Sequence, residues 1–310
     1  MATAPPHRLR RVLTVSSNKG GVGKTTVAAH LALYIRALLE DLPVLVVGLD
    51  DQQTLDRFFA LGELRPEQGN LKHAIAERSF DRVLRLGQYG IHFVPSPPDT
   101  ALIKARATDP ALLGRVLDHT DFEGLVIFDT KSDLEALTRS AIHASDRVIV
   151  PVADRASLLE AERVLALAGG RGRLLLTLVD RRSRGAGEVV STAEQLEREI
   201  ERRGLPRYRT TLSRSPRVEA LLSGGPRPLS ILHHGAGTAV HRELRLLAEE
   251  VIDELGLDAA APARPRRAPR TRRGEPAGLV AGIAGVIRRS LGGRPGGRAA
   301  AISPRNGRSS

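Results

Sequence analysis

The chain has 310 residues, no cysteine and a formal net charge of +12. Without cysteine, a disulfide framework, a thiolate metal site and a cysteine nucleophile are excluded. No stretch approaches the ~20 consecutive apolar residues of a membrane-spanning helix, and residues 1–11 lack the apolar region of a signal peptide. We therefore expect a cytoplasmic protein.

The positive charge is concentrated at the C-terminal end. Residues 259–310 contain twelve arginines and a single acid, whereas basic and acidic residues nearly balance over 1–258. A basic segment rich in Pro, Gly and Ala cannot bury enough apolar surface to fold alone, and its charge favours an anionic partner. We predict a short leader (1–10), one α/β domain (11–258) and a disordered basic tail (259–310).

The sequence N-K-G-G-V-G-K-T-T at residues 18–26 lies between an apolar run, 12–15, and a helical pattern, 27–38. This strand-to-helix context is the one that a phosphate-binding loop requires. Its glycines let backbone N–H groups surround a polyphosphate, and the start of the following helix attracts the same anion. We predict that Lys24 reaches the β- and γ-phosphates of a nucleotide and that the Thr25 hydroxyl ligates Mg²⁺.

Two apolar runs each end on an aspartate, as expected where buried parallel strands carry chemistry at their carboxyl ends. The run 43–49 leads to Asp50, and the run 125–128 leads to Asp129. With a phosphate-binding loop about a hundred residues upstream, Asp129 reads as a Walker B residue, which holds Mg²⁺ or orients the nucleophile. The metal residues that these patterns predict are Thr25 and Asp129. Lys131, two residues beyond Asp129, is interpreted equally well as a phosphate contact or as a solvated charge.

The loop K-G-G-V-G-K-T-T resembles the deviant Walker A loop of the ParA/MinD family of P-loop ATPases. The resemblance implies that Lys19 reaches across a nucleotide sandwich dimer to the partner's phosphates. Residues 48–52, G-L-D-D-Q, resemble the family's D-x-D-P-Q, whose second aspartate acts on the Mg²⁺ and water side of the γ-phosphate. The resemblance therefore implies a catalytic or switch role for Asp50 and adds it to the predicted metal residues Thr25 and Asp129. Gly48 replaces the first aspartate of that motif, and Asp51 replaces its proline. The predicted catalytic residues are Lys19, Lys24, Asp50 and Asp129.

The resemblance extends over residues 10–256 and implies a doubly wound, mostly parallel sheet flanked by helices. Near its end, Asp180 follows a strand that resembles the family's adenine-side turn, and residues 213–220 resemble I-P-R-N-V-R-x-x-E-A, with Ser213 in place of the proline. The N-K-x-D signature of guanine readers is missing at that turn, which favours ATP over GTP. The predicted nucleotide-binding residues are Lys19, Gly20, Gly21, Val22, Gly23, Lys24, Thr25, Thr26, Asp180, Ser213 and Arg214. Further elements are expected as strands at 91–96, 146–151 and 208–212 and as helices within 53–87 and at 102–117, 155–168, 188–203 and 238–255.

Two segments suggest surfaces that bind a partner. Between 171 and 227, thirteen arginines face seven acids, which fits either non-specific DNA binding through phosphate contacts or a solvated charged face. Within the tail, residues 278–291 place apolar side chains on one helical face, similar to the membrane-targeting helix of MinD-type relatives, although two glycines weaken that helix. A segment that docks on a partner protein fits the same pattern.

The leading hypothesis is an ATPase of the ParA type, which forms a homodimer with ATP, cycles on and off DNA and positions a plasmid, chromosome locus or protein complex. The family also implies an activating, ParB-like partner. Three alternatives remain open: a MinD-like ATPase on an anionic membrane, a metabolic ligase of the dethiobiotin-synthetase type, and a nucleotide-binding scaffold with little turnover, which the glycine at position 48 motivates.

Overall fold

The computed structural model describes residues 10–50, 52–97, 109–180, 191–223, 225 and 227–257. Residues 1–9 of the predicted leader and the predicted tail 259–310, with its apolar segment 278–291, lie outside the described residues. Asp51 and three of the arginines in the 171–227 segment, at positions 181, 182 and 184, lie outside them as well.

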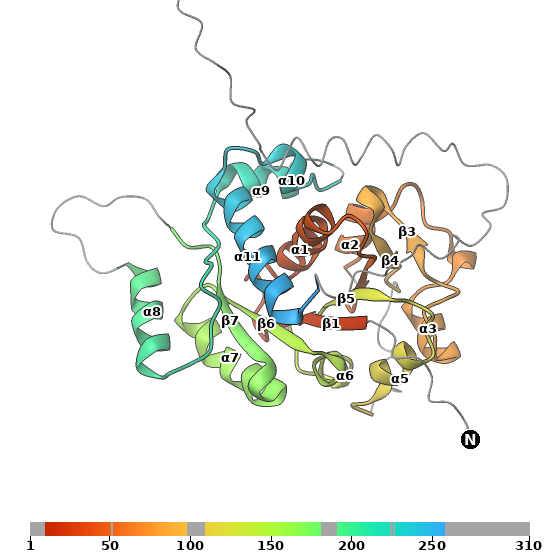
Figure 1. Ribbon diagram of the computed structural model, residues 1–310, viewed down its shortest axis with the longest axis horizontal. Helices are drawn as coiled ribbons and strands as arrows, with labels where there is room; N and C mark the ends of the chain where they lie inside the picture. Colours follow the sequence, from red (N-terminus) through yellow and green to blue (C-terminus); the bar gives the residue numbers. More distant parts are fainter. Residues whose placement is uncertain are drawn as a thin grey trace, which may run out of the picture.

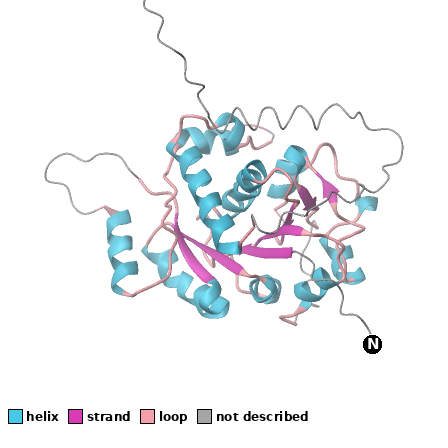
Figure 2. Cartoon of the chain, in the orientation of Figure 1, coloured by secondary structure: helices cyan, strands magenta, loops and turns pink. Residues whose placement is uncertain are grey.

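A seven-stranded sheet forms the centre of the molecule (Figures 1 and 2). Its order is β3-β4-β2-β5-β1-β6-β7, and all neighbours are parallel except the short edge strand β3, which is antiparallel to β4. The strands are β1 (Arg10–Val15), β2 (Val44–Gly48), β3 (Arg85–Leu86), β4 (His92–Val94), β5 (Gly124–Asp129), β6 (Arg147–Val152) and β7 (Gly172–Leu176).

The central strands are buried on both faces, as their continuous apolar runs predict. Alternate residues of one strand serve opposite faces: Leu125 and Ile127 pack into one core cluster, whereas Val126 and Phe128 pack into another. The first cluster lies under α1, α2 and α11, and the second lies under α3, α5 and α6 (Figure 1). A third cluster joins β6 and β7 to α7 and α8. The sheet therefore lies between two helical layers.

The helices enclose the sheet in chain order, mostly one after each strand. They are α1 (Lys24–Leu38), α2 (Thr54–Phe59), α3 (Leu71–Glu77), α5 (Leu112–Asp118), α6 (Ala136–Ala144), α7 (Arg155–Ala168), α8 (Thr192–Arg202), α9 (Pro216–Ser223), α10 (Ile231–His234) and α11 (Ala239–Leu255), with short 3-10 turns η1 (Pro66–Gln68), η2 (Gln88–Gly90) and η3 (Gly169–Arg171). This architecture confirms the predicted doubly wound, mostly parallel sheet.

The strand expected at 208–212 is wrong. This segment donates to β7 at two points, from Tyr208 N–H to Leu174 O and from Leu212 N–H to Leu176 O, but it forms no strand. Isolated bridges join Leu174 to Arg207 and Val179 to Ser213. Between the bridges, the backbone N–H groups of Arg209 and Thr210 donate to the Glu250 carboxylate on α11, at 3.0 and 2.9 Å. A side chain distant in sequence has taken the donors that a strand would have used.

The sheet register brings the ends of three strands together. Val15 at the end of β1 is paired with Asp129 at the end of β5, and Asp129 is paired in turn with Gly48 at the end of β2. In open parallel sheets, ligands bind beyond the carboxyl ends of the strands. The loop after β1 and the acids after β2 and β5 therefore share one edge of the sheet.

Candidate functional site

The loop between β1 and α1 has the backbone shape that its glycines predict. Gly21 and Gly23 have φ of 77° and 87°, a left-handed conformation that side-chain-bearing residues seldom adopt. Gly23 is the N-cap of α1, and as a glycine it has no side chain with which to cap this helix. The first N–H groups of α1 are thus not engaged by a capping side chain, an arrangement suited to an anionic ligand.

Lys24 begins α1, and its side chain lies inside the loop with only 8% of its surface exposed. Its Nζ donates to the Lys19 carbonyl oxygen at 3.1 Å and to the Ser132 hydroxyl. Burial lowers the pKa of Lys24, and three nearby carboxylates, Asp129, Asp50 and Asp133, oppose that shift. The structure therefore gathers Lys24, Asp50 and Asp129, which lie far apart in the sequence, within electrostatic reach of one another.

Asp129 ends β5 and is 2% exposed. The Thr25 side chain forms a hydrogen bond with its carboxylate, while burial raises the pKa of Asp129 to about 7. Within the described part of the chain, no hydrogen-bond partner reaches Asp129 Oδ1. A hydroxyl oxygen and a carboxylate oxygen with free acceptor capacity, side by side, fit the ligand preference of Mg²⁺. The donor set thus accords with the predicted metal residues Thr25 and Asp129.

Asp50 lies two residues beyond the end of β2, and its Oδ1 accepts from the Gln52 backbone N–H at 3.2 Å. The sequence motif that Asp50 resembles carries another aspartate where this chain has Gly48. A Cβ at position 48 would lie 3.0 Å from Ser96 Oγ and 3.1 Å from Leu55 Cδ1, closer than ordinary contact. The glycine is therefore part of a packed junction of β2, α2 and the end of β4.

The predicted adenine-side residues meet at the end of β7. The Val179 N–H donates to Leu212 O, and the Arg214 N–H donates back to Val179 O, at 3.0 and 2.8 Å. Asp180, Ser213 and Arg214 are thereby adjacent. The polar atoms of Ser213 are turned to α11, because both its N–H and its hydroxyl donate to the buried Glu243 carboxylate, at 2.7 and 2.6 Å. Glu243 was missed by the sequence reasoning because it lies thirty residues away on a helix with no motif.

A second residue that the sequence reasoning missed is Thr177, just after β7. Its buried hydroxyl donates to the Val22 carbonyl oxygen at 2.9 Å, and its N–H donates to Val152 O. The phosphate-binding loop is thus tied to the strand end that leads to Asp180. A threonine after the apolar run 174–176 was the available signal.

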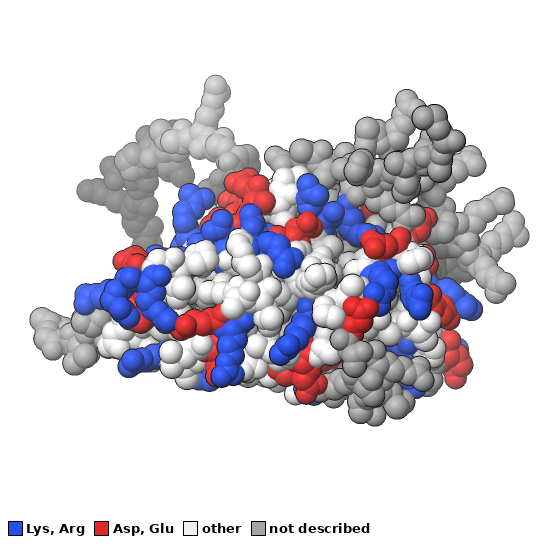
Figure 3. Space-filling view, turned by 90° about the horizontal axis from the view of Figure 1, so that it is seen from below, with Lys and Arg blue, Asp and Glu red and all other residues white. Residues whose placement is uncertain are grey.

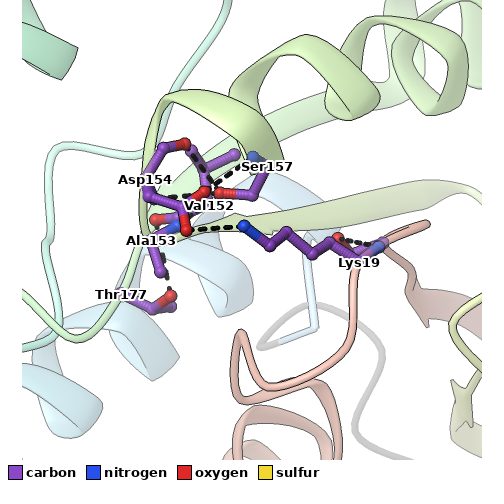
Figure 4. A network of polar contacts seen from close by, with 7 residues as sticks. Lys19, Val152, Ala153, Asp154, Ser157 and Thr177 are labelled. Atoms are coloured by element: carbon purple, nitrogen blue, oxygen red, sulfur yellow. Dashed lines mark hydrogen bonds and ion pairs between the residues drawn. The ribbon is translucent and has the colours of Figure 1, made fainter.

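Lys19 crosses the mouth of the loop to α7 (Figure 4). Its Nζ lies 2.6 Å from Asp154 Oδ2, with 36% and 46% of the two side chains exposed. Asp154 is the N-cap of α7, and its Oδ1 accepts from the Ser157 N–H at 2.7 Å. The hydrogen bond from Lys19 is the largest influence that holds the pKa of Asp154 below its usual range. Lys131 is half-buried.

The arginines predicted as a binding surface are largely paired with acids. Among the described residues of that segment, ion pairs join Arg173 to Glu254, Arg202 to Glu199, Arg203 to Glu162, Arg207 to Glu197, Arg209 to Glu250 and Arg214 to Glu219. One face of the molecule accordingly shows basic and acidic side chains interspersed (Figure 3). Arg209 nevertheless keeps 89% of its side chain exposed, so it is accessible to an anionic partner.

The parallel sheet, the glycine-shaped loop and the buried Lys24 at the start of α1 define a P-loop nucleotide-binding protein. A family model described as an AAA domain matches residues 10–165. The chromosome-partitioning ATPase Soj of Thermus thermophilus is 30% identical over 258 residues, which cover 79% of this chain and 96% of that protein. The chain belongs to the ParA/MinD family of P-loop ATPases, whose relatives imply ATP hydrolysis.

Other relatives share less of their length. A "Probable plasmid-partitioning protein ParA" of Thermus thermophilus is 29% identical over 158 residues, and the chain spans about half of it, 48%. Among solved structures, a variant of McdA from Cyanothece in complex with ATP has a TM-score of 0.65 at 17% identity, covering 81% of this chain and 98% of that one. A cobyrinic acid a,c-diamide synthase from Mycobacterium smegmatis with bound ADP and magnesium has a TM-score of 0.60 at 23% identity, covering 82% and 98%. At these identities, both structures bear on the fold alone.

Over the described ranges between residues 10 and 257, no helix combines the length and the apolarity needed to cross a bilayer.

Proposed function

We propose that this chain is a Mg²⁺-dependent ATPase of the ParA type, which dimerises with ATP and grips non-specific DNA until hydrolysis releases it. The observation that carries the proposal is the set of charges around the loop. Lys24 lies among Asp50, Asp129 and Asp133, and Lys19 stands at the mouth of the loop with its side chain partly exposed.

The chain's own residues have distinct tasks in this proposal. Lys24 and the loop amides would hold the β- and γ-phosphates, while Thr25 and Asp129 would hold the metal ion. Asp50, outside the strand and half-buried, would orient the attacking water. ATP supplies a γ-phosphate that is present in one state and gone in the other. Lys19 would contact the partner's phosphates only in the ATP-bound state, so the dimer would form with ATP and separate after hydrolysis.

DNA is the surface that we propose, acting through the arginines of the 171–227 segment. Most of their ion pairs are at least partly exposed, and such pairs contribute only about 0–1 kcal/mol each. Phosphate groups can therefore compete for these arginines at little cost. The cargo and the activating partner, which in this proposal is ParB-like, would bind to surfaces that only the dimer presents.

The first test measures ATP affinity by calorimetry and dimerisation by light scattering with ATP. Lys24→Ala removes the buried ammonium, so we expect a folded chain that no longer binds ATP. Lys19→Ala leaves the loop intact, so we expect ATP binding without dimerisation. ATP affinity like that of the original chain in the Lys24 variant, or an ATP-dependent dimer in the Lys19 variant, contradicts the assignment.

The same preparations test the surface. DNA binding should require ATP, ignore sequence and weaken with salt. Arg209→Ala should reduce the slope of log affinity against log salt by about 0.9 for each phosphate contact that the dimer loses. Arg245→Ala is the matched control, because Arg245 lies on α11 outside the segment and is paired with Glu249. Equal slopes for the two variants argue against Arg209 as a contact. Binding to anionic vesicles in place of DNA would favour the membrane alternative.

A further inference from the structure

Two consecutive residues of the loop are attached to the first turns of α7. Lys19 pairs with Asp154, and the amide of Asn18 donates to Glu160 Oε2 at 2.6 Å. Both contacts lie within one chain, and Lys19 is the residue that the proposed function assigns to the partner's site. In the isolated chain, therefore, the ammonium group already has a carboxylate partner (Figure 4).

Capping alone does not require a carboxylate at position 154. The three other described helices whose N-cap side chain accepts a hydrogen bond, α3, α8 and α11, use the uncharged Asn70, Ser191 and Thr238. In Asp154 the two oxygens have separate tasks, since Oδ1 accepts from the Ser157 N–H and Oδ2 faces Lys19. An asparagine would keep the first task and lose the charge that serves the second.

We propose that Asp154 is a positioning residue, which holds Lys19 on its own chain until an ATP-dependent dimer forms. The proposal rests on the proposed function, in which Lys19 crosses to the partner. Assembly then breaks one ion pair in each protomer. Because both side chains are partly exposed, one pair changes an equilibrium by about two- to threefold. Two pairs per dimer give roughly a fivefold bias against assembly, which raises the concentration of ATP-bound chain that is needed for dimers.

The test is Asp154→Asn in the full chain, with dimerisation measured against protein concentration in the presence of ATP. We expect a tighter dimer, with a dissociation constant roughly fivefold lower than that of the original chain. The thermal midpoint should be nearly unchanged, because asparagine still caps α7. Glu162→Gln is the matched control: it also removes an acid of α7, but one that pairs with Arg203. We expect the control to leave the dimer constant unchanged. A dimer that is unchanged or weaker in Asp154→Asn overturns the proposal.

A second measurement does not depend on the dimer. In the nucleotide-free chain, an amine-reactive ester should label Lys19 faster in Asp154→Asn than in the original chain, and Glu162→Gln should not change the rate. Equal labelling rates mean that Asp154 does not hold Lys19, and the proposal fails. A different result is faster labelling in Asp154→Asn together with no ATP-dependent dimer in any variant or in the original chain. The ion pair between Lys19 and Asp154 would then be real, but the proposed function would fail. The role of Asp154 in dimer assembly would be overturned as well.

Discussion

Replacing Gly48 with aspartate tests why this chain departs from the motif that it resembles. One explanation is that a catalytic carboxylate has been lost from a space that could still hold it. The structure supports the other explanation, in which neighbouring side chains already fill the space. Ser96 Oγ and Leu55 Cδ1 would lie 3.0 and 3.1 Å from a new Cβ, and contact of that kind begins to be ordinary only at 3.4 Å.

The expected cost has two parts. Crowding by Cβ forces Leu55 or Ser96 to move, and overpacking of this kind costs about 1–3 kcal/mol. The carboxylate adds desolvation, for which the nearby Asp56 is a guide, because burial raises its pKa to about 6 from 3.8. That difference corresponds to about 3 kcal/mol at neutral pH. We therefore expect Gly48→Ala to lower the free energy of unfolding by about 1–3 kcal/mol, and Gly48→Asp by about 4–6 kcal/mol.

Urea unfolding at pH 7 followed by circular dichroism measures both variants, and ATP turnover is measured in parallel. Ser96→Ala supplies a matched background, because it removes the oxygen nearest to the new Cβ and should recover part of the loss in Gly48→Ala. Unfolding of Gly48→Asp at the original urea concentration, together with faster turnover, would show that the space was open and that this reasoning is wrong.

Two further predictions concern single hydrogen-bonding groups. The pKa of Asp56 is raised in the folded state, mainly by burial, so the folded chain loses stability as pH rises from about 4 to about 6. Asp56→Asn removes this loss, so its effect on the free energy of unfolding should become more favourable by up to about 3 kcal/mol over that range. Urea unfolding at pH 4 and at pH 7 measures the difference. A gain that is equal at both pH values contradicts the burial argument. Thr177→Val keeps the shape but leaves Val22 O without its donor, so ATP affinity by calorimetry should fall by about fivefold, or roughly 1 kcal/mol. Unchanged affinity would mean that the loop does not depend on β7.

The sequence was informative where chemistry is local. Glycines followed by Lys24 and Thr25 fix a turn between a strand and a helix, and apolar runs that stop at an acid mark strand ends. Parallel pairing then brings those ends to one edge, so the proximity of Asp50 and Asp129 to Lys24 followed from the predicted fold. The buried strands β1, β2, β5 and β6 lie where they were expected for the same reason, because buried strands of a parallel sheet must be apolar throughout.

Sequence reasoning failed where a distant side chain decides the local structure. The segment 208–212 has a strand-like pattern, yet the Glu250 carboxylate takes two of its backbone donors. Likewise, nothing in the sequence indicated that the Ser213 hydroxyl donates to Glu243; the expectation that Ser213 flanks adenine stays a prediction. Neither glutamate has a motif, since α11 is amphipathic and its acids look like an ordinary solvated face. Only the packing of α11 against β7 and the 207–214 segment reveals their tasks.

Charge counting had a related weakness, and it bears on what the arginine segment can do. Thirteen arginines against seven acids suggested a surplus, but acids from α7 and α11, outside the segment, neutralise several of them: Glu162, Glu250 and Glu254. A surface of paired charges repels DNA less than an acidic one and attracts it less than an unpaired one. Strong binding to phosphates then needs many such contacts at once, which two chains side by side would supply better than one. The pairing thus offers a physical reason for DNA binding to depend on the ATP-bound dimer.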